Sequence, residues 1–565
     1  MNLKAYACAA LAVLLLSGCQ TVAVVEDSVD FSAEYFGTLE PFASEAVYFI
    51  VTDRFVDGDP DNNYPDQGGV ELGTFDRPIR LAGSAPANIG YLGGDFKGVL
   101  ENADYIADMG FTAIWLTPIV DNPDEAFTGG KAPGEGGSND YGKTGYHGYW
   151  GVNFFELDEH LPSVDLDYAE LTRRLQQQHG IRTVLDVVCN HGSPSFSMTH
   201  DQPKYGELYN ADGELVADHG NLHPTELDPH NPLHAFYRNE PDLAELSDMN
   251  YDNPAVLDYF VAAHSKWLAE GASAFRIDTI KHMPHAFWKD FSDRIRQQYP
   301  GLFMFAEAWS FDAEFLAEYT RPENGGISVL DFPGREAMVS VFGSQDSDYS
   351  NLLDYLHLDT GIYQSPYELM TFYDNHDMTR IDADEDGFID ANNWLFTSRG
   401  IPVVYYGSEI GFRAGADQHA GNRDYFGQEN IEVAKSHRIH AALSRIAAIR
   451  KDSVALQRGL QANLQFAGDI ASFYRVYQKD GLNQIALVLL NKSDEPADFQ
   501  VTKWLSHGSW RDADTGDVVV VPSESPKLVA ALPPHAVKVL LLDAPVNNPE
   551  LAAELSRLQG RALRR

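Results

Sequence analysis

Short hydrophobic runs rich in β-branched residues recur along the chain and alternate with segments of helical periodicity. Eight such runs are found: VYFIVTD (47–53), TAIWLTP (112–118), IRTVLDVV (181–188), SAFRID (273–278), LFMFAEAW (302–309), ISVLDF (327–332), LMTFYDN (369–375) and IPVVYYG (401–407). The segments between them, such as YAELTRRLQQQHG, place leucines at helical spacing. Repeated βα units predict an α/β fold, a closed (β/α)8 TIM barrel over residues 43–455. The alternative is an open doubly wound sheet, but no G-x-G-x-x-G follows the first run.

Two departures from this regular spacing predict additional units. Residues 192–249, after the third run, are rich in Pro, His, Asn and Asp. A structureless loop of that length is improbable in a compact domain, so an inserted subdomain is expected there. After a helical pattern at 441–449, the alternation in IASFYRVY, NQIALVLLNK and VKVLLLDA predicts a C-terminal antiparallel β-sandwich domain over 456–545. The tail, 546–565, is predicted to be a surface helix.

The N-terminal residues 1–19 have the pattern of a secretory signal: Lys4, an apolar run, then Leu-Ser-Gly-Cys ending at Cys19. This ending resembles the bacterial lipoprotein box, which implies a lipid on Cys19 as the only membrane contact of an otherwise soluble protein. Gln20 favours the outer membrane of a Gram-negative host. The alternative is an ordinary signal peptide with an incidental cysteine. Residues 20–42 are predicted to form a linker.

The charge balance narrows the classes of partner. The chain has 565 residues with 41 Lys and Arg against 83 Asp and Glu, a formal net charge of −42. Such an acidic protein repels nucleic acid and anionic lipid, and suits a neutral substrate. Of its cysteines, Cys8 and Cys19 lie in the signal segment and only Cys189 remains, so the mature chain has no internal disulfide framework.

Polar and charged residues gather where the predicted barrel strands end. They are Asp186, Asn190 and His191 on the third run, Arg276 and Asp278 on the fourth, Glu307 on the fifth, and His376 and Asp377 after the seventh. Taken singly, each strand-terminal carboxylate is typical of a helix cap or an ion pair. Together they lie on the face where barrel enzymes build their sites. Several carboxylates around an arginine fit glycosidic bond cleavage, which needs one protonated and one ionised carboxyl at the same pH.

Four ordered segments, LDVVCNH, FRIDTIKH, FAEAW and FYDNHD, resemble the signature segments of the α-amylase family, glycoside hydrolase family 13. The resemblance extends over residues 43–545. It implies that Asp278 is the nucleophile, Glu307 the general acid and later base, and Asp377 the stabiliser of the transition state. The reaction would be a double displacement that retains the α configuration, with the Asp278 and Glu307 carboxyls ~5 to 5.5 Å apart.

The same resemblance implies a set of substrate-binding residues. Arg276 would hold Asp278 ionised, and Tyr146 or Tyr149 would form an aromatic platform for a sugar ring. The further sugar contacts implied are His147, His191, Lys281, His282, Trp309 and His376. Trp150, beside them in GYHGYW, is expected to pack in the core instead.

The turn VDGDPDNN, residues 56–63, is dense in oxygen ligands of the kind that calcium prefers. It does not match an EF-hand, because Asn62 replaces the required glycine and Gly68 stands in place of the bidentate glutamate. It resembles instead the N-terminal calcium site of bacterial α-amylases and cyclodextrin glucanotransferases. That resemblance implies Ca²⁺ ligands from Asp57, Asp59, Asn62, Asn63, the carbonyl of Gly93 and Asp95. The alternative is a solvated turn.

A second calcium site is implied at the junction between the inserted subdomain and the barrel. Its ligands would be Asn190, Asp248 and the carbonyl of His282. Both calcium ions are expected to be structural.

Within the family, two features favour an endo-acting hydrolase of starch or maltooligosaccharides. Cyclodextrin-forming members place Tyr or Phe four residues before the aspartate that corresponds to Asp248, where this chain has Ala244. It also shows a single β domain after the barrel. α-Glucosidases specific for short substrates usually carry Gln-Pro-Asp-Leu-Asn where this chain has LSDMN. The runner-up is an α-glucanotransferase acting on the same glucans. A non-catalytic glycan-binding scaffold is the third reading, but such relatives lose catalytic carboxylates, and this chain retains all three.

Overall fold

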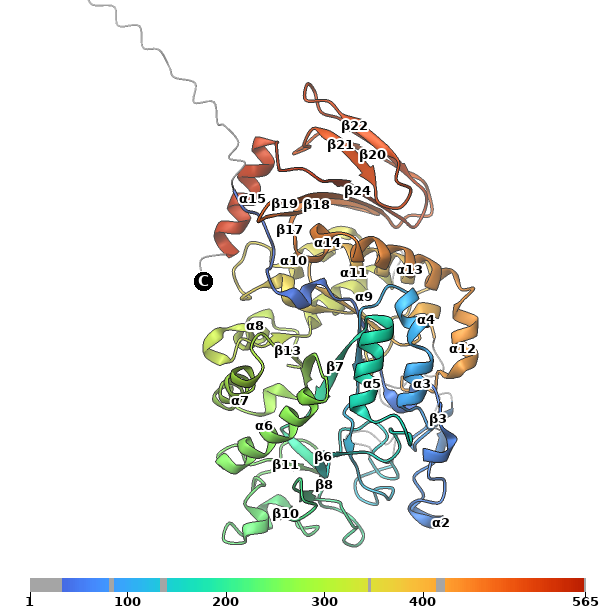
Figure 1. Ribbon diagram of the computed structural model, residues 1–565, viewed down its shortest axis with the longest axis vertical. Helices are drawn as coiled ribbons and strands as arrows, with labels where there is room; N and C mark the ends of the chain where they lie inside the picture. The colour runs from blue at the N-terminus through green and yellow to red at the C-terminus, as the bar shows by residue number, and fades with distance from the viewer. Residues whose placement is uncertain (1–32, 81–85, 133–139, 344–346, 413–421, 563–565) are drawn as a thin grey trace, which may run out of the picture.

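The computed structural model describes residues 33–80, 86–132, 140–343, 347–412 and 422–562. The predicted signal, Cys19 with its predicted lipid, and the first part of the predicted linker lie outside these residues. Figure 1 shows the barrel in the middle of the molecule, with the inserted subdomain at one end and the C-terminal β domain at the other.

Eight parallel strands form the barrel. They are β1 (Val47–Ile50), β4 (Ala113–Leu116), β7 (Arg182–Val187), β12 (Ala274–Ile277), β13 (Phe303–Ala306), β14 (Ser328–Val329), β15 (Met370–Thr371) and β16 (Ile401–Tyr405). The hydrogen-bonded order runs β14-β13-β12-β7-β4-β1-β16-β15. The two outer strands meet through a parallel bridge between Leu330 and Met370, where the Asp331 N–H donates to the Met370 carbonyl at 3.0 Å. The predicted (β/α)8 barrel is confirmed, with one strand in each of the eight hydrophobic runs.

Helices surround the barrel because each presents one apolar face to the strands. The principal ones are α3 (Phe96–Glu101), α4 (Ala103–Asp108), α5 (Tyr168–Arg174), α6 (Pro254–Ala269), α7 (His285–Gln298), α8 (Ala313–Thr320), α9 (Phe332–Phe342), α11 (Glu385–Thr397), α12 (Gly427–Ala434) and α13 (Arg438–Lys451). Helix α6 begins where the Asn253 side chain accepts the Ala255 N–H and Pro254 occupies the first turn. It buries Phe260 and Trp267. The Phe260 ring contacts Phe154 at a centroid distance of 5.0 Å, and the Trp267 indole N–H donates to the Phe154 carbonyl at 3.0 Å.

The inserted subdomain is larger than the predicted range 192–249. Its four-stranded sheet has the order β10-β9-β6-β5, with bounds β5 (Val120–Asp121), β6 (Asn153–Leu157), β9 (Glu207–Tyr209) and β10 (Leu215–Asp218). Two of these strands therefore come from the segment after the second barrel strand. The reason is physical: the two short strands from the insert need further strands to cover their backbone and buried side chains. The pair β8 (His191–Pro194) and β11 (Leu246–Asp248) joins the two ends of the insert.

The later part of the predicted linker, residues 33–42, packs against the folded domains. Tyr35 is buried and forms an antiparallel bridge with Gln478, with backbone hydrogen bonds of 2.8 and 2.7 Å. Phe42 stacks on Phe303 at a centroid distance of 4.6 Å. These aromatic side chains bury apolar surface, so this stretch is structured rather than a free linker.

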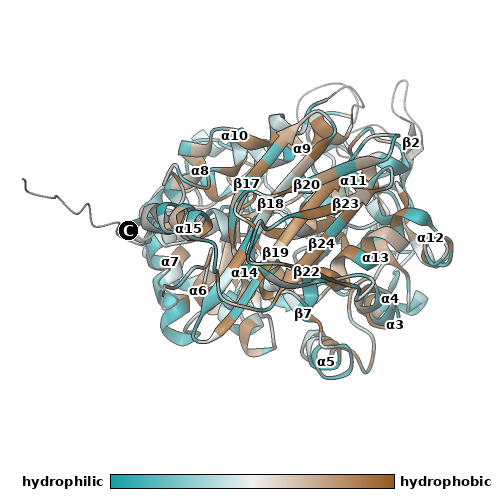
Figure 2. Ribbon diagram, turned by 90° about the horizontal axis from the view of Figure 1, so that it is seen from above, coloured by the Kyte–Doolittle hydropathy of each residue, from teal (hydrophilic) through white to brown (hydrophobic). Residues whose placement is uncertain are grey.

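The C-terminal domain consists of two antiparallel sheets, as predicted. The larger sheet has the order β17-β18-β19-β24-β21-β22, and the smaller sheet pairs β20 with β23. The bounds of the larger sheet are β17 (Leu460–Ala467), β18 (Ile470–Lys479), β19 (Leu482–Asn491), β24 (Ala536–Leu542), β21 (Gly508–Asp512) and β22 (Val518–Val521). Those of the smaller sheet are β20 (Ala497–Val501) and β23 (Leu528–Leu532). Seen from above, hydrophobic residues run along β19 and β24 (Figure 2). Helix α15 (Pro549–Ala562) buries Leu551, Leu555 and Leu558 against this domain. Across the described ranges, no helix combines the length and apolarity needed to cross a membrane.

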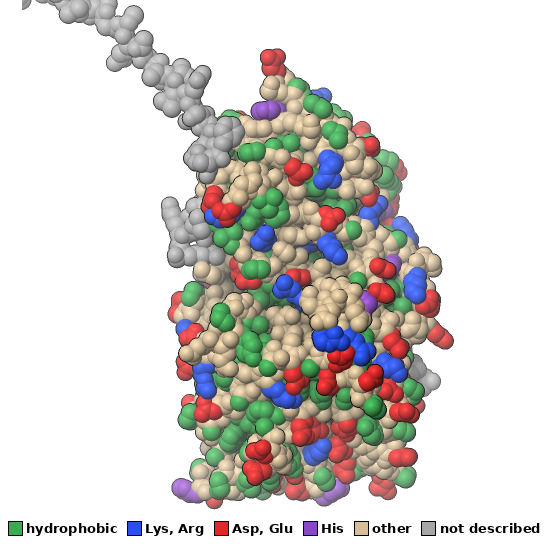
Figure 3. Space-filling model, viewed as in Figure 1, with side chains coloured by type: hydrophobic (Ala, Val, Ile, Leu, Met, Phe, Trp, Pro, Cys, Tyr) green, Lys and Arg blue, Asp and Glu red, His purple; other side chains and the backbone are tan. Residues whose placement is uncertain are grey.

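The surface reflects the acidic composition. Acidic side chains are scattered over the barrel, the inserted subdomain and the C-terminal domain on the face shown in Figure 3.

Candidate active site

Strand register places the carboxylates of Asp278 and Glu307 side by side. Ile277 pairs with Ala306 across the parallel strands β12 and β13. The next residue on each strand is Asp278 and Glu307, whose backbone N–H groups donate to Val187 and Ile277 carbonyls at 2.9 Å. Both carboxylates therefore emerge at the same rim of the barrel.

A cavity of about 430 Å³ opens at this rim. Its wall is formed by Asp140, Lys143, His147, Tyr149, Trp150, His191, Leu243, Ala244, Leu246, Asp278, Thr279, Glu307, Trp309, His376, Asp377 and Arg423. All three carboxylates that the sequence singled out as catalytic thus face one cavity.

The Arg276 guanidinium lies under the cavity floor, fully buried between three carboxylates. Its Nη1 lies 2.9 Å from Asp186 Oδ1 and 2.6 Å from Asp278 Oδ1. Its Nη2 lies 3.2 Å from Glu307 Oε2. One cation is shared by three acids, so the group holds more negative charge than Arg276 can neutralise.

Burial, reinforced by these neighbouring negative charges, sets the protonation of Glu307. Burial, together with repulsion from Asp278 and Asp377, raises the pKa of Glu307 to about 8, although Arg276 opposes the shift. Burial also raises the pKa of Asp186 to about 7 against the pull of Arg276. Glu307 is therefore mainly protonated at neutral pH and available as a proton donor.

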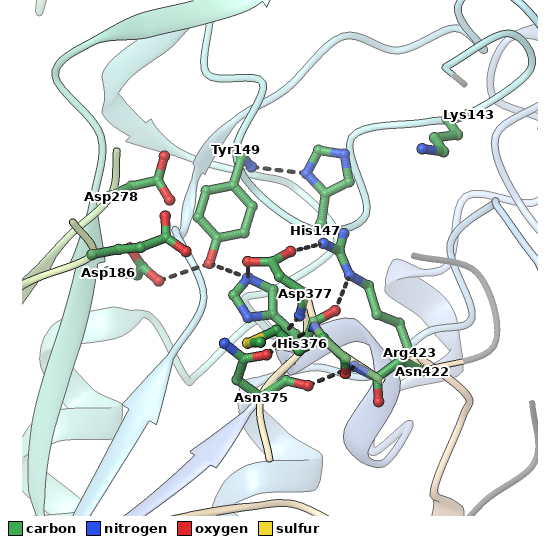
Figure 4. Close-up of polar contacts among 12 residues, drawn as sticks. Lys143, His147, Tyr149, Asp186, Asp278, Asn375, His376, Asp377, Asn422 and Arg423 are labelled. Atoms are coloured by element: carbon green, nitrogen blue, oxygen red, sulfur yellow. Dashed lines mark hydrogen bonds and ion pairs between the residues drawn. The ribbon is translucent and has the colours of Figure 1, made fainter. Parts of the chain in front are cut away.

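Tyr149 connects the two sides of the site (Figure 4). Its hydroxyl donates to Asp186 Oδ2 at 2.8 Å and lies 2.9 Å from Nε2 of His376. Beside it, Arg423 Nη2 donates to Asp377 Oδ1 at 2.5 Å, and Arg423 Nε donates to the His376 carbonyl at 3.1 Å. These contacts fix the orientation of the residues after the seventh strand.

Not every predicted sugar contact reaches the cavity. His147, Tyr149, His191, Trp309 and His376 line it. Tyr146, Lys281 and His282 are not among the residues that line it, and their predicted sugar contacts stay predictions. Tyr146 is buried behind the wall under the Arg54 guanidinium, 3.7 Å from its ring centroid. Lys281 Nζ donates to the Trp309 carbonyl at 3.1 Å, and His282 Nδ1 lies 3.1 Å from Asp242 Oδ2.

Several wall residues were missed or misplaced by sequence reasoning, among them Arg423, Lys143, Trp150 and Thr279. Arg423 and Lys143 lie on loops without a recognised motif, although Arg423 follows the eighth strand, whose carboxyl end shares the rim. Trp150, expected in the core, is buried but also forms part of the wall. Thr279, next to Asp278, has a φ of 47°, a strained conformation for a β-branched residue.

The turn at 56–63 brings together side-chain oxygens of the kind that bind a hard cation. Asp57 Oδ1, Asn62 Oδ1 and Asn63 Oδ1 are buried with no hydrogen-bond partner among the described residues. Gly93, at φ 89°, faces them, and a Cβ there would lie 2.3 Å from Asn63 Oδ1. Asp95 adds a carboxylate within 3.3 Å of the Asn62 amide. Asp59 is half-exposed and caps the Asp61 N–H at 3.4 Å, so its place as a ligand is the weakest. The donor set fits a calcium ion.

The second predicted cation site is partly assembled. The Met249 N–H donates to the Asn190 carbonyl at 2.8 Å, which brings Asp248 beside Asn190. Asp248 Oδ2 accepts the Asp242 N–H at 2.7 Å, and Asp248 Oδ1 is buried without a partner within the described chain. A further acidic group, Asp121, Asp124 and Glu159, is close enough to share an ion. There, however, Lys204 Nζ lies 3.1 Å from Asp121 and 3.2 Å from Asp124 and supplies the positive charge.

Comparison with known proteins gives a consistent family. The family described as "Alpha amylase, catalytic domain" matches residues 49–440. The cyclomaltodextrin glucanotransferase of Klebsiella oxytoca is 28% identical over 518 residues, covering 82% of this chain and 72% of that enzyme. The alpha-amylase of Niallia circulans is 29% identical over 465 residues, covering 80% and 81%.

A solved structure with similar architecture is CldA, described as the first cyclomaltodextrin glucanotransferase with a three-domain ABC distribution. It superimposes with a TM-score of 0.72 at 28% identity, covering 88% of this chain and 99% of that one. Several other glucanotransferases are longer, and the chain spans 59% to 64% of their length.

Proposed function

Because the chain belongs to the alpha-amylase family, glycoside hydrolase family 13, we propose that it is a retaining hydrolase of α-1,4-glucosidic bonds in starch or maltooligosaccharides. The observation that carries this proposal is that Asp278, Glu307 and Asp377 lie on the wall of one cavity. Asp278 and Glu307 also share one buried cation, Arg276. Asp186 is the third acid on that cation.

The proposed reaction has two displacement steps. The Asp278 carboxylate, held by Arg276, attacks the anomeric carbon and forms a glucosyl ester, while Glu307 gives its proton to the departing glycosidic oxygen. The resulting Glu307 carboxylate then takes a proton from water, and the water oxygen attacks the anomeric carbon and releases Asp278. Asp377 stabilises the positive charge that develops on the sugar ring in both steps.

One observation favours hydrolysis over transfer. Ala244 lies in the cavity wall, where cyclising members of the family place Tyr or Phe. The expectation drawn from a single β domain carries no weight, because CldA is described as a glucanotransferase with three domains. The glucanotransferases among the relatives keep transfer as the second candidate.

Product analysis of soluble starch separates these candidates. Linear maltooligosaccharides that appear first as α anomers in early-time NMR support the proposed hydrolase. Cyclic or elongated products support the glucanotransferase, and β anomers contradict both. The inactive control is Asp278→Asn.

We expect activity to fall as the pH rises through about 8, because Glu307 must carry its proton and its pKa is raised to about 8. Asp377→Asn removes one neighbouring negative charge that raises this pKa, so the alkaline limb should move to lower pH. The measurement is kcat/KM against pH on a chromogenic maltooligosaccharide. If the alkaline limb of the residual Asp377→Asn activity stays at the native pH, the assignment of Glu307 as the proton donor is contradicted.

The calcium site at 56–63 is part of the proposal. A chelator should lower the Tm by roughly 5 to 10 °C, because an ion that binds only the folded state stabilises it. Asp57→Asn should shrink this shift, whereas Asp66→Asn, on an exposed position nearby, should leave it intact. An unchanged Tm with chelator in the native protein would refute the site.

We also propose that the protein is exported and anchored to the outer membrane through lipid on Cys19. The support is the Leu-Ser-Gly-Cys sequence at the end of the signal segment. The native chain should fractionate with membranes and Cys19→Ser should not. If the native chain and Cys19→Ser are found outside the membrane fraction to the same extent, the lipid anchor is contradicted.

A further inference from the structure

Two neighbouring side chains, Asn422 and Arg423, hold the loop that carries Asp377 (Figure 4). Asn422 Nδ2 donates to the Asn375 carbonyl at 2.5 Å and to the Met378 carbonyl at 2.7 Å. Asn422 is buried, so water does not compete for these hydrogen bonds. They join both ends of the loop and fix its shape.

Arg423 fixes the carboxylate itself. Its Nε donates to the His376 carbonyl at 3.1 Å, and its Nη2 donates to Asp377 Oδ1 at 2.5 Å. The other carboxylate oxygen, Asp377 Oδ2, lies 3.3 Å from Nε2 of His376. Because a guanidinium presents its N–H groups in a rigid fork, these contacts set the direction of the Asp377 side chain relative to its own backbone.

The same segment of chain reaches the proposed calcium loop at 56–63. The Tyr425 hydroxyl accepts the Asp57 N–H at 2.8 Å. The Phe426 N–H donates at 2.8 Å to the carbonyl of Arg54, two residues before the loop. Asp57 Oδ1 is one of the buried oxygens that a calcium ion would bind. An ion that fixes Asp57 therefore also fixes Tyr425, through a direct hydrogen bond.

The connection between Tyr425 and Arg423 is short. Asp424 is the single residue between them. The hydroxyl of Tyr406, the residue after strand β16, donates to the Asp424 carbonyl at 2.7 Å. The segment is thus held against the rim of the barrel, and a shift at Tyr425 is passed on to Arg423.

We infer that residues 422–425 position Asp377 for the proposed reaction, and that calcium bound at 56–63 sets the place of these residues. The inference rests on the proposed function for the role of Asp377. Arg423 is a positioning residue, because a carboxylate turned away from the anomeric carbon no longer stabilises charge there. The ion at 56–63 then acts on the catalytic rim, beyond the structural role that the sequence predicts for it.

Hydrogen exchange tests this connection without any substrate. The amides of Asp377 and Met378 report on the loop, because both donate to Asn375 Oδ1, at 3.1 and 2.9 Å. In the native protein, a calcium chelator should speed their exchange about tenfold, measured by mass spectrometry of peptic peptides. Strand β19 of the C-terminal domain is the internal control and should not change.

Tyr425→Phe should abolish this response, because it removes the acceptor of the Asp57 N–H. Exchange within 56–63 should still respond to the chelator in this variant. Tyr64→Phe, an exposed tyrosine directly after the loop, is the matched control and should behave as the native protein. The connection is overturned if the native Asp377 amide does not respond, if β19 responds equally, or if the response persists in Tyr425→Phe.

Kinetics test the positioning role of Arg423. Arg423→Lys keeps the charge but cannot make both contacts, so kcat on a chromogenic maltooligosaccharide should fall about 10²-fold while KM changes less than about twofold. Arg438→Lys, at an exposed ion pair on helix α13, should keep both native values. The Tm shows that each variant is folded.

A kcat of Arg423→Lys within about threefold of the native value, at any KM, would overturn the positioning role. If the native chain cleaves no glucan, the proposed function fails, and the exchange experiment alone then judges the connection.

Discussion

Asp278→Asn is expected to lower kcat/KM on soluble starch by about 10⁴-fold or more, the scale of removing a covalent nucleophile. Asparagine keeps the shape of the side chain but cannot form the glucosyl ester. Asp278 is also one of three acids on Arg276, so the variant leaves that cation with Asp186 and Glu307. We expect Asp278→Asn to fold, which a Tm close to that of the native protein would show.

The matched control is Asp290→Asn, an exposed aspartate on helix α7. It should retain native activity, because it lies outside the cavity. Activity of Asp278→Asn within tenfold of the native value would remove Asp278 from the role of nucleophile.

Arg276→Gln is expected to damage both stability and catalysis. Without the guanidinium, Asp186, Asp278 and Glu307 are buried with no shared cation, and the free energy of unfolding should fall by about 3 to 5 kcal/mol. The folded fraction should lose about 10² to 10³-fold in kcat/KM, because Asp278 loses the hydrogen-bonding cation that orients its carboxylate. Denaturant unfolding and steady-state kinetics measure the two effects separately.

A second buried arginine separates these effects. Arg399 is fully buried and its Nη1 lies 2.6 Å from Asp331, away from the cavity wall. Arg399→Gln should lose similar stability but keep native kcat/KM in its folded fraction. If both variants lose activity in proportion to stability alone, Arg276 has no particular role at the site.

The barrel and the site carboxylates could be predicted from the sequence because both depend on local signals. A buried parallel strand is a short apolar run, and the rim residue directly follows it, as Asp278 follows Ile277 and Glu307 follows Ala306. Parallel register then brings the following residues together without further information. The fold and the candidate carboxylates therefore depend on the same eight runs.

Other parts depend on contacts between distant segments, which no local pattern records. Strands β5 and β6 join the inserted subdomain only because β6 pairs with β9, across more than fifty residues. Arg423 reaches Asp377 from a loop with no recognised motif. Lys281 and His282 lie within a family motif, yet their side chains contact the Trp309 carbonyl and Asp242, and neither residue is among those that line the cavity.

The central claim is that segments far apart in the chain form one retaining site with Asp278 as nucleophile. Its most direct test is to trap the glucosyl ester with an α-glucosyl fluoride that carries fluorine at C5, digest the protein, and locate the added mass by tandem mass spectrometry. The account predicts the sugar on Asp278 in the native protein and no label in Asp278→Asn. A label on another residue, or turnover that releases β anomers without a covalent adduct, would contradict it.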